Sequence, residues 1–283
     1  MPSMKAIKRR ISSVTTTKQV MKAMDMVAAA KLQKAKGQLD AARPFVDEMV
    51  RAIDEVKNVQ DAIESQYFKQ REVKNSAFVV IAGDSGLCGS YNANVLTKAL
   101  PLMEGKNEKI IAIGTRGRDF FKRNKKNIHE SFSISETLTF DEARKVCSLL
   151  LFMYHNGEID EIYVAYTKYV SALSQVPHLI RVLPVSPDPE TQTASARMQF
   201  ESGAEEYLES AIPMYLKAII YGALIESFTS EQAARMVNMD SAVNNAGELI
   251  DDLTLLRNRK RQALITQEIN EIVNGVNTLK SKR

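Results

Sequence analysis

Apolar residues recur at alternating spacings of three and four near both ends of the chain, which is typical of helices that pair along a seam. In residues 1–57 they form two runs separated by a phase slip: Ile7, Ile11 and Val14, then Val20, Met24 and Val27. Ala, Lys, Met and Gln, which favour helices, fill most of the other positions. The pattern predicts one long helix, which Pro44 kinks or interrupts because it has no backbone donor.

Residues 214–283 show the same spacing over a longer stretch. The apolar positions are Ala246, Leu249, Leu253 and Leu256, then Ile265, Ile269, Ile272, Val276 and Leu279. A helix of about 65 residues reaches roughly 100 Å, which exceeds the diameter of a small domain. Its far part therefore needs a partner, and the N-terminal helix is available. We expect the two to form an antiparallel coiled coil.

The middle of the chain changes to strand-like patterning. Apolar runs at 77–83, 109–115, 161–170 and 178–185 alternate with helical stretches near 92–103, 116–124 and 139–155. Alternating strands and helices predict βαβ units and a largely parallel, doubly wound sheet. The predicted organisation is an N-terminal coiled-coil helix, a connector, a central α/β domain, a foot segment and a C-terminal coiled-coil helix, with bounds 1–57, 58–75, 76–195, 196–213 and 214–283.

Charge is divided unevenly along the chain. The whole chain carries +4, but residues 1–43 carry +8 and residues 257–283 carry +5, so the residues between them carry −9. Basic ends suggest an acidic partner, nucleic acid or an anionic surface, while a merely solvated helix face stays open as the alternative. There is no run of 18 apolar residues and no secretory leader, so we expect neither a membrane span nor export.

One glycine-rich segment invites an enzymatic interpretation. GDSGLCGSYN at 83–92 follows a predicted strand and precedes a helix, where backbone N–H groups can hold a phosphate. Its spacing matches neither the dinucleotide fingerprint nor a P-loop, which favours tight-turn glycines. Cys88 is expected to be a buried thiol, and three scattered histidines give no metal-ligand spacing. We therefore expect no catalytic residue, no cofactor and no metal.

Five separated blocks resemble the gamma subunit of F-type ATP synthases, in the same order. They are IKRRISSVTTTKQVMKAMDMVAAAKLQKA at 7–35, GDSGLCGSYNANV at 83–95, IGTRGRDFFKR at 113–123, YVSALSQVPHLIRVLPV at 169–185 and SEQAARMVNMDSAVNNAGELIDDLTLLRNRKRQALITQEINEIVNG at 230–275. Ser85 stands where that family often has Arg, and Val276 where it commonly has Ala.

The resemblance implies a non-catalytic rotor subunit, present once per complex and forming the central stalk of the catalytic head, CF(1). The implied partners are the alpha and beta subunits, the epsilon subunit and the membrane c-ring. Hydrogen ion transport through the ring would drive ATP synthesis through rotation of this chain. The implied location is peripheral, on the cytoplasmic face of a bacterial inner membrane. A nucleic-acid-binding coiled coil and a nucleotide-using enzyme with a helical arm remain as rivals, although we expect no nucleic acid partner.

The resemblance also implies roles for particular residues. The residues expected to contact the alpha and beta subunits are Lys22, Met24, Arg257, Arg261, Gln262, Thr266 and Glu268. Arg261 suits such a contact because its planar guanidinium can hold a carboxylate with two hydrogen bonds. For Met24, packing in the seam is an equally good interpretation. Phe200 and Glu201 occupy the place of the family's foot segment, where contacts with the c-ring are expected.

Overall fold

The computed structural model describes residues 3–56, 65–69, 72–134, 138–185 and 204–280, without the side chains of residues 204 and 275–280. The chain divides into two compact units. We call Met1–Val27 together with Met236–Arg283 the terminal unit, and Ala28–Arg235 the central unit. Helix α1 (Met4–Val56) and helix α6 (Ala204–Lys280) each contribute to both units.

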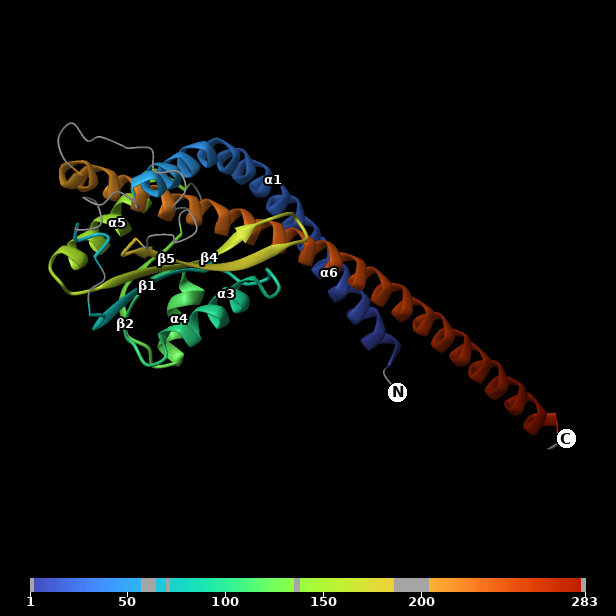
Figure 1. Ribbon diagram of the computed structural model, residues 1–283. Helices are drawn as coiled ribbons and strands as arrows, with labels where there is room; N and C mark the ends of the chain where they lie inside the picture. Colours follow the sequence, from blue (N-terminus) through green and yellow to red (C-terminus); the bar gives the residue numbers. More distant parts are fainter. Residues whose placement is uncertain (1–2, 57–64, 70–71, 135–137, 186–203, 281–283) are drawn as a thin grey trace. The chain divides into compact units, whose positions relative to one another are not determined.

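The central unit contains a five-stranded sheet in the order β3-β2-β1-β4-β5 (Figure 1). The strands are β1 (Asn75–Ile81), β2 (Asn107–Ile113), β3 (Ile128–Phe132), β4 (Glu161–Tyr169) and β5 (Gln175–Leu183). The first four are parallel, and β5 runs antiparallel to β4. The predicted doubly wound sheet is confirmed. Strand β3 was not predicted, because only its two end residues are apolar.

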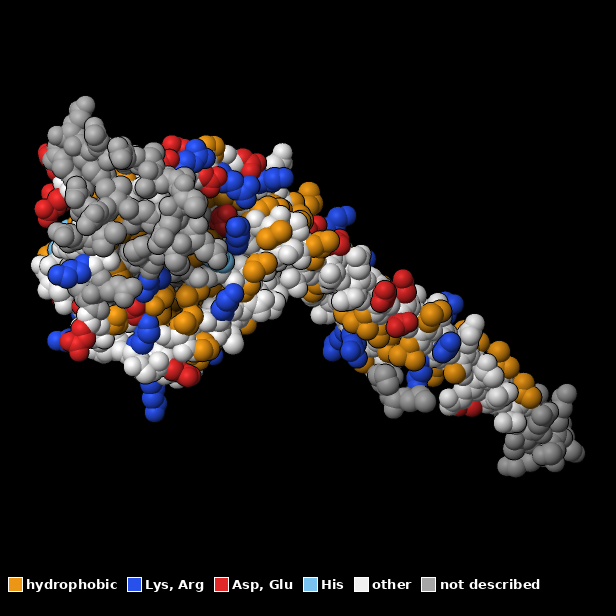
Figure 2. Space-filling view, in the orientation of Figure 1, with side chains coloured by type: hydrophobic (Ala, Val, Ile, Leu, Met, Phe, Trp, Pro, Cys, Tyr) orange, Lys and Arg blue, Asp and Glu red, His pale blue; other side chains and the backbone are white. Residues whose placement is uncertain are grey.

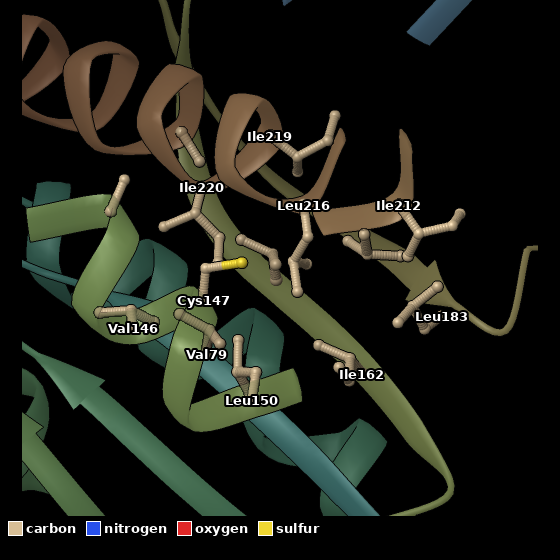
Figure 3. Close-up of a cluster of buried hydrophobic side chains, with 14 of the residues drawn as sticks. Val79, Val146, Cys147, Leu150, Ile162, Leu183, Ile212, Leu216, Ile219 and Ile220 are labelled. Atoms are coloured by element: carbon tan, nitrogen blue, oxygen red, sulfur yellow. The ribbon is translucent and has the colours of Figure 1, made fainter. Parts of the chain in front are cut away.

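Helices cover both faces of this sheet. They are α3 (Tyr91–Ala99), followed by the short η1 (Leu100–Met103), α4 (Thr115–Arg123) and α5 (Phe140–His155). Side chains of β1 alternate between two cores: Phe78 and Val80 pack with α3 and α4, while Val79 and Ile81 pack with α5 and α6. Figure 3 shows Cys147 and Leu150 of α5 facing Leu216 and Ile220 of α6 across the second core. Alternation along β1 thus holds a helix on each face.

Two prolines lie inside long helices. Helix α1 runs through Pro44 without ending, so of the predicted kink or interruption the structure rules out the interruption. Helix α6 passes through Pro213 and begins at Ala204, ten residues earlier than expected. Packing outweighs the missing hydrogen bond at both sites, because buried residues lie on either side: Leu39, Ala42 and Ile53 in α1, and Leu208, Ile212 and Leu216 in α6.

Helix α6 spans 77 residues, or roughly 115 Å of helix axis. It includes a stretch with a mean hydropathy of 1.3 that is long and apolar enough to cross a membrane, but half of that stretch is buried inside the protein. Burial of this kind is typical of a core helix, which passes the same test by length and composition.

Candidate partner-binding surface

Helix α1 presents one seam in the terminal unit, and this seam keeps its phase. One row of buried and half-buried side chains follows spacings of four and three without a slip: Ile7, Ile11, Val14, Lys18, Met21 and Asp25. Thr15, next to Val14, is half-buried beside this row. Two polar residues therefore occupy seam positions. Figure 1 shows α1 and α6 side by side in this unit, with the start of α1 and the end of α6 pointing in the same direction. The two helices therefore run antiparallel, as predicted.

The phase slip predicted from the apolar residues is wrong. Val20, Met24 and Val27 are exposed by 52%, 40% and 54%, and they lie outside the seam. The pattern misled because Lys18 holds a position that an apolar residue normally takes. Gly247 of α6 makes room for it: a Cβ added at Gly247 would lie 2.9 Å from the Lys18 Nζ. Met24 is consequently a surface residue, and the seam interpretation of it is excluded.

Helix α6 contributes the matching seam. One row of protected positions follows spacings of four and three: Met239, Val243, Ala246, Ile250, Leu253, Arg257 and Lys260. Residues beside this row, such as Ala242 and Thr254, are half-buried as well. Ala246 and Leu253 are confirmed as seam residues, whereas Leu249 and Leu256 are 38% and 44% exposed. Lys18 lies opposite Gly247, and fourteen residues separate Lys18 from Met4, where α1 begins. Fourteen residues beyond Gly247 on α6 is Arg261, so pairing within the chain ends there.

Beyond Arg261 the helix continues past the start of α1. Every side chain from Arg261 to Asn274 is exposed. We call this stretch the helix tip. Its large apolar side chains are Leu264, Ile265, Ile269, Ile272 and Val273. The expectation that α1 covers the apolar repeat starting at Ile265 is therefore wrong, because α1 is too short; Val276 and Leu279 lie beyond the described side chains.

Basic residues of both helices gather where the pairing ends. The antiparallel register brings the first residues of α1 opposite the stretch of α6 that precedes the tip. We call the following eight residues the basic cluster: Lys5, Lys8, Arg9, Arg10, Arg257, Arg259, Lys260 and Arg261. Within the described part of the chain, no ion pair joins any of them to a carboxylate. Figure 2 shows basic and apolar side chains on this pair of helices. The cluster creates a local positive potential beside an exposed apolar surface.

The glycine-rich segment at 83–92 is already occupied by its own side chains. The Asp84 carboxylate accepts hydrogen bonds from the backbone N–H and the hydroxyl of Thr115, both at 2.7 Å, at the start of α4. It also accepts one from the N–H of Ile134 at 2.9 Å. The Gly83 N–H donates to Asn92 Oδ1 at 2.7 Å. Asp84 thus caps α4, and Asn92 binds the backbone of Gly83, so side chains of this segment hold the turn in place.

The two thiols and His155 of the central unit also have structural surroundings. Cys88 is buried as predicted, and burial raises the pKa of its thiol, which opposes a nucleophilic role. Burial raises the pKa of Cys147 to about 12. His155 shares a hydrogen bond of 2.8 Å with the Tyr67 hydroxyl. Across the described residues, no group of three His, Cys, Asp or Glu side chains could hold a metal ion.

Comparison with known proteins identifies the family. A family described as ATP synthase matches residues 3–279. The ATP synthase gamma chain of Alkaliphilus metalliredigens is 41% identical, and the match covers 98% of this chain and 99% of that one. The chain belongs to the ATP synthase gamma-chain family. A gamma chain of Acetobacterium woodii described as sodium ion specific is 38% identical, with 96% and 97% of the two chains covered.

Solved structures of ATP synthase rotors share the fold of this gamma chain. A chain from the Euglena gracilis mitochondrial ATP synthase, in a structure of OSCP, F1 and the c-ring, matches with a TM-score of 0.69 at 18% identity, covering 98% of this chain and 94% of that one. A chain from the central stalk and c-ring of the Tetrahymena thermophila enzyme gives 0.61 at 23% identity, covering 79% and 99%. The gamma chain thus shares the fold of these ATP synthase chains.

The residues expected to contact alpha and beta subunits fall into two separate places. Arg261, Gln262, Thr266 and Glu268 are exposed at the start of the helix tip, and Arg257 is half-buried just before it. Lys22 and Met24 are exposed on α1. In the antiparallel register Lys22 lies opposite Val243, which is 18 residues from Arg261 and hence about 27 Å along the axis.

The sequence did not predict the whole of this surface. Phe200 and Glu201, expected at the c-ring, lie outside the described residues. The basic cluster was seen only as two separate basic ends, and the α1 side of it was not singled out. The register of α1 against α6 shows that the two basic ends lie together. That register can be found when Lys18 and Asp25 are treated as seam positions.

Proposed function

We propose that this gamma chain is the rotor shaft of an ATP synthase and transmits torque between the membrane c-ring and the catalytic beta subunits. Proton flow through the ring turns the shaft, and its asymmetric cross-section drives the beta sites through different conformations. The chain contributes coupling and performs no chemistry. It acts as one copy per complex, bound to alpha, beta, epsilon and the c-ring, on the cytoplasmic face of a bacterial inner membrane.

The observation that carries this proposal is the helix tip. Five large apolar side chains exposed on one stretch of helix are typical of a surface that binds another protein. The neighbouring basic cluster favours a socket with acidic loops. An unbroken α6 links the central sheet to that tip, as a shaft requires.

The contacts proposed for Arg261 and Gln262 suit a rotating surface. Both side chains are exposed, so they are available to acidic loops of the catalytic subunits. Electrostatic attraction is less directional than interlocking side chains, so it holds the shaft without fixing its angle. Arg257, Thr266, Glu268, Lys22 and Met24 extend the contact along the shaft.

Two experiments test the proposal. Purification of the tagged chain from its source cells, after nuclease treatment, should recover alpha, beta and epsilon subunits; recovery of nucleic acid alone would contradict it. In the reassembled complex, Arg261→Ala with Gln262→Ala should lower ATPase rate or coupling. Unchanged ATPase and ion pumping would refute the proposed contacts. Stability of the isolated chain should stay within about 0.5 kcal/mol, because both residues are exposed.

A further inference from the structure

Helix α6 buries an unusual polar stretch where it crosses the central sheet. Ser227, Thr229, Ser230, Glu231 and Gln232 are each at most 5% exposed. Burying a polar side chain costs free energy unless a hydrogen bond compensates for it. Apolar residues would pack here at a lower cost in free energy. The hydrogen bonds that these polar side chains make therefore indicate what the stretch does.

Two serines bind the edge of strand β4. The Thr167 N–H donates to the Ser227 hydroxyl at 3.1 Å, and the Ser230 hydroxyl donates to the Thr167 carbonyl at 3.2 Å. The pairing of β4 with β1 ends at Ala165, so Thr167 lies past that ladder. The side chains of α6 thus take the place of a neighbouring strand, and both backbone groups of one residue fix the position of the helix.

Glu231 and Arg235 bind the loop that follows β1. The Arg235 guanidinium donates to the Ser85 hydroxyl at 2.8 Å, to the Gly86 carbonyl at 3.3 Å and to the Glu231 carboxylate at 2.5 Å. Glu231 lies so close to the loop that a Cβ at Gly83 would be 2.9 Å from its Cδ. Side chains of the pair are 14% and 6% exposed, so water screens their attraction weakly.

These contacts form one stripe along the helix. Ser227, Ser230, Glu231 and Arg235 are spaced three, one and four residues apart, so they lie on one face over about two turns. They bind the ends of two adjacent central strands, β1 and β4. A rotation of α6 by about 30° moves an atom at a radius of about 5.5 Å by about 3 Å, which breaks these hydrogen bonds. Apolar packing alone is non-directional and resists such rotation less.

We propose that this stripe is a clamp that fixes the rotational register of α6 on the central sheet, with Arg235 as its main positioning residue. The proposal rests on the rotor function proposed above and adds the place where torque passes between sheet and shaft. Arg235 is the last residue of the central unit, so the clamp lies just before α6 enters the terminal unit.

The first test uses hydrogen exchange in the isolated full-length chain. Arg235→Ala removes three hydrogen bonds to or from a charged group, so local opening of residues 83–92 and 227–235 should become at least about tenfold more frequent. Arg235→Lys keeps the charge beside Glu231 but loses the planar fork, so its exchange should be intermediate. Arg118→Ala, which breaks an exposed pair with Asp119, is the control. Exchange in Arg235→Ala equal to that in Arg118→Ala would overturn the clamp.

The second test measures torsional stiffness in the assembled complex. The helix tip is cross-linked to a catalytic subunit, and the thermal angular fluctuation of a probe on the central unit is recorded. Arg235→Ala should broaden the angular distribution and reduce ions pumped per ATP. Val95→Ala, which opens a cavity in the core on the other face of the sheet, controls for lost stability. If both variants broaden the angular distribution equally, Arg235 acts only through the stability of the chain, and the proposal is overturned.

The outcomes separate the clamp from the rotor function. If the complex with the unsubstituted chain shows no coupled pumping, the rotor function fails and the clamp with it. If that complex and Arg118→Ala pump normally and Arg235→Ala equals them, the rotor function stands and the clamp is wrong. Loss of coupling in Arg235→Ala alone, with partial recovery in Arg235→Lys, supports the clamp.

Discussion

Gly247 provides a test of how the two helices of the terminal unit meet. Gly247→Ala places a Cβ 2.9 Å from the Lys18 Nζ, and the next nearest atom, the Lys18 Cε, is 3.9 Å away. Only the end of a flexible side chain must move, by a few tenths of an ångström. Alanine is favoured over glycine in a helix by about 1 kcal/mol. We expect a net stabilisation of about 0.5–1 kcal/mol in the helix pair.

Hydrogen exchange measures this locally, because two units need not unfold in one transition. Amides of residues 239–253 should exchange about two- to fivefold more slowly in Gly247→Ala. Gly37→Ala is the matched control, because Gly37 lies inside α1 with nothing within 4 Å of its added Cβ and should gain the full helix preference. Faster exchange in Gly247→Ala, with slower exchange in Gly37→Ala, would refute the placement of Lys18 against Gly247.

Three further substitutions give distinct results. Gly114→Ala should destabilise the central unit by more than about 3 kcal/mol in urea unfolding, because Gly114 has φ +94 and its Cβ would lie 2.0 Å from the Ala82 carbonyl oxygen; a smaller loss would contradict that geometry. Met24→Lys should change the stability of the isolated chain by less than about 0.5 kcal/mol, because Met24 is exposed. It should nevertheless lower coupling in the complex. A large loss of stability would indicate that Met24 packs in the seam. Glu161→Gln should cost about 3 kcal/mol at pH 7, because Glu161 is buried against Lys106. Burial alone would raise the Glu161 pKa, but hydrogen bonds from Lys106, Ser76 and Tyr163 lower it. The stabilisation by ionised Glu161 is therefore present above the ordinary glutamate pKa and is lost as the pH falls through the lowered value. An equal cost of the substitution at pH 3 and pH 7 would refute this.

The central sheet could be predicted because its strands are apolar on both faces. Runs such as Phe78 to Ile81 are buried on two sides, and hydrophobicity alone marks them. Strand β3 escaped prediction because it lies at the edge of the sheet and its middle residues, His129 to Ser131, are exposed. Periodicity reports burial, so it reveals an edge strand poorly.

The shaft shows where apolar patterning fails. Val20, Met24 and Val27 have the right spacing for a seam but lie on the surface, whereas Lys18 and Asp25 are half-buried in it. Helix α1 thus carries two rows with apolar residues, and only one of them faces α6. Apolar spacing alone does not show which row is buried.

The buried polar stripe of α6 could not be predicted either, because its contacts depend on the tertiary fold. Ser227, Ser230 and Glu231 interrupt an apolar helix, and their partners, Thr167 and the loop after β1, are distant in sequence. Only the fold brings a strand edge and a glycine-rich loop to the same helix face. The glycine-rich segment was predicted to be a structural turn, but its role in receiving Arg235 depends on the tertiary contacts.

Direct observation of rotation tests the proposed function most sharply. Cys88 and Cys147 are buried, so a cysteine introduced at exposed Lys122 in α4 can be labelled selectively with a probe. With the alpha and beta subunits fixed to a surface, addition of ATP should turn the probe continuously in one direction. ATP hydrolysis by the same molecules with a stationary probe would contradict the assignment of this chain as the rotor shaft.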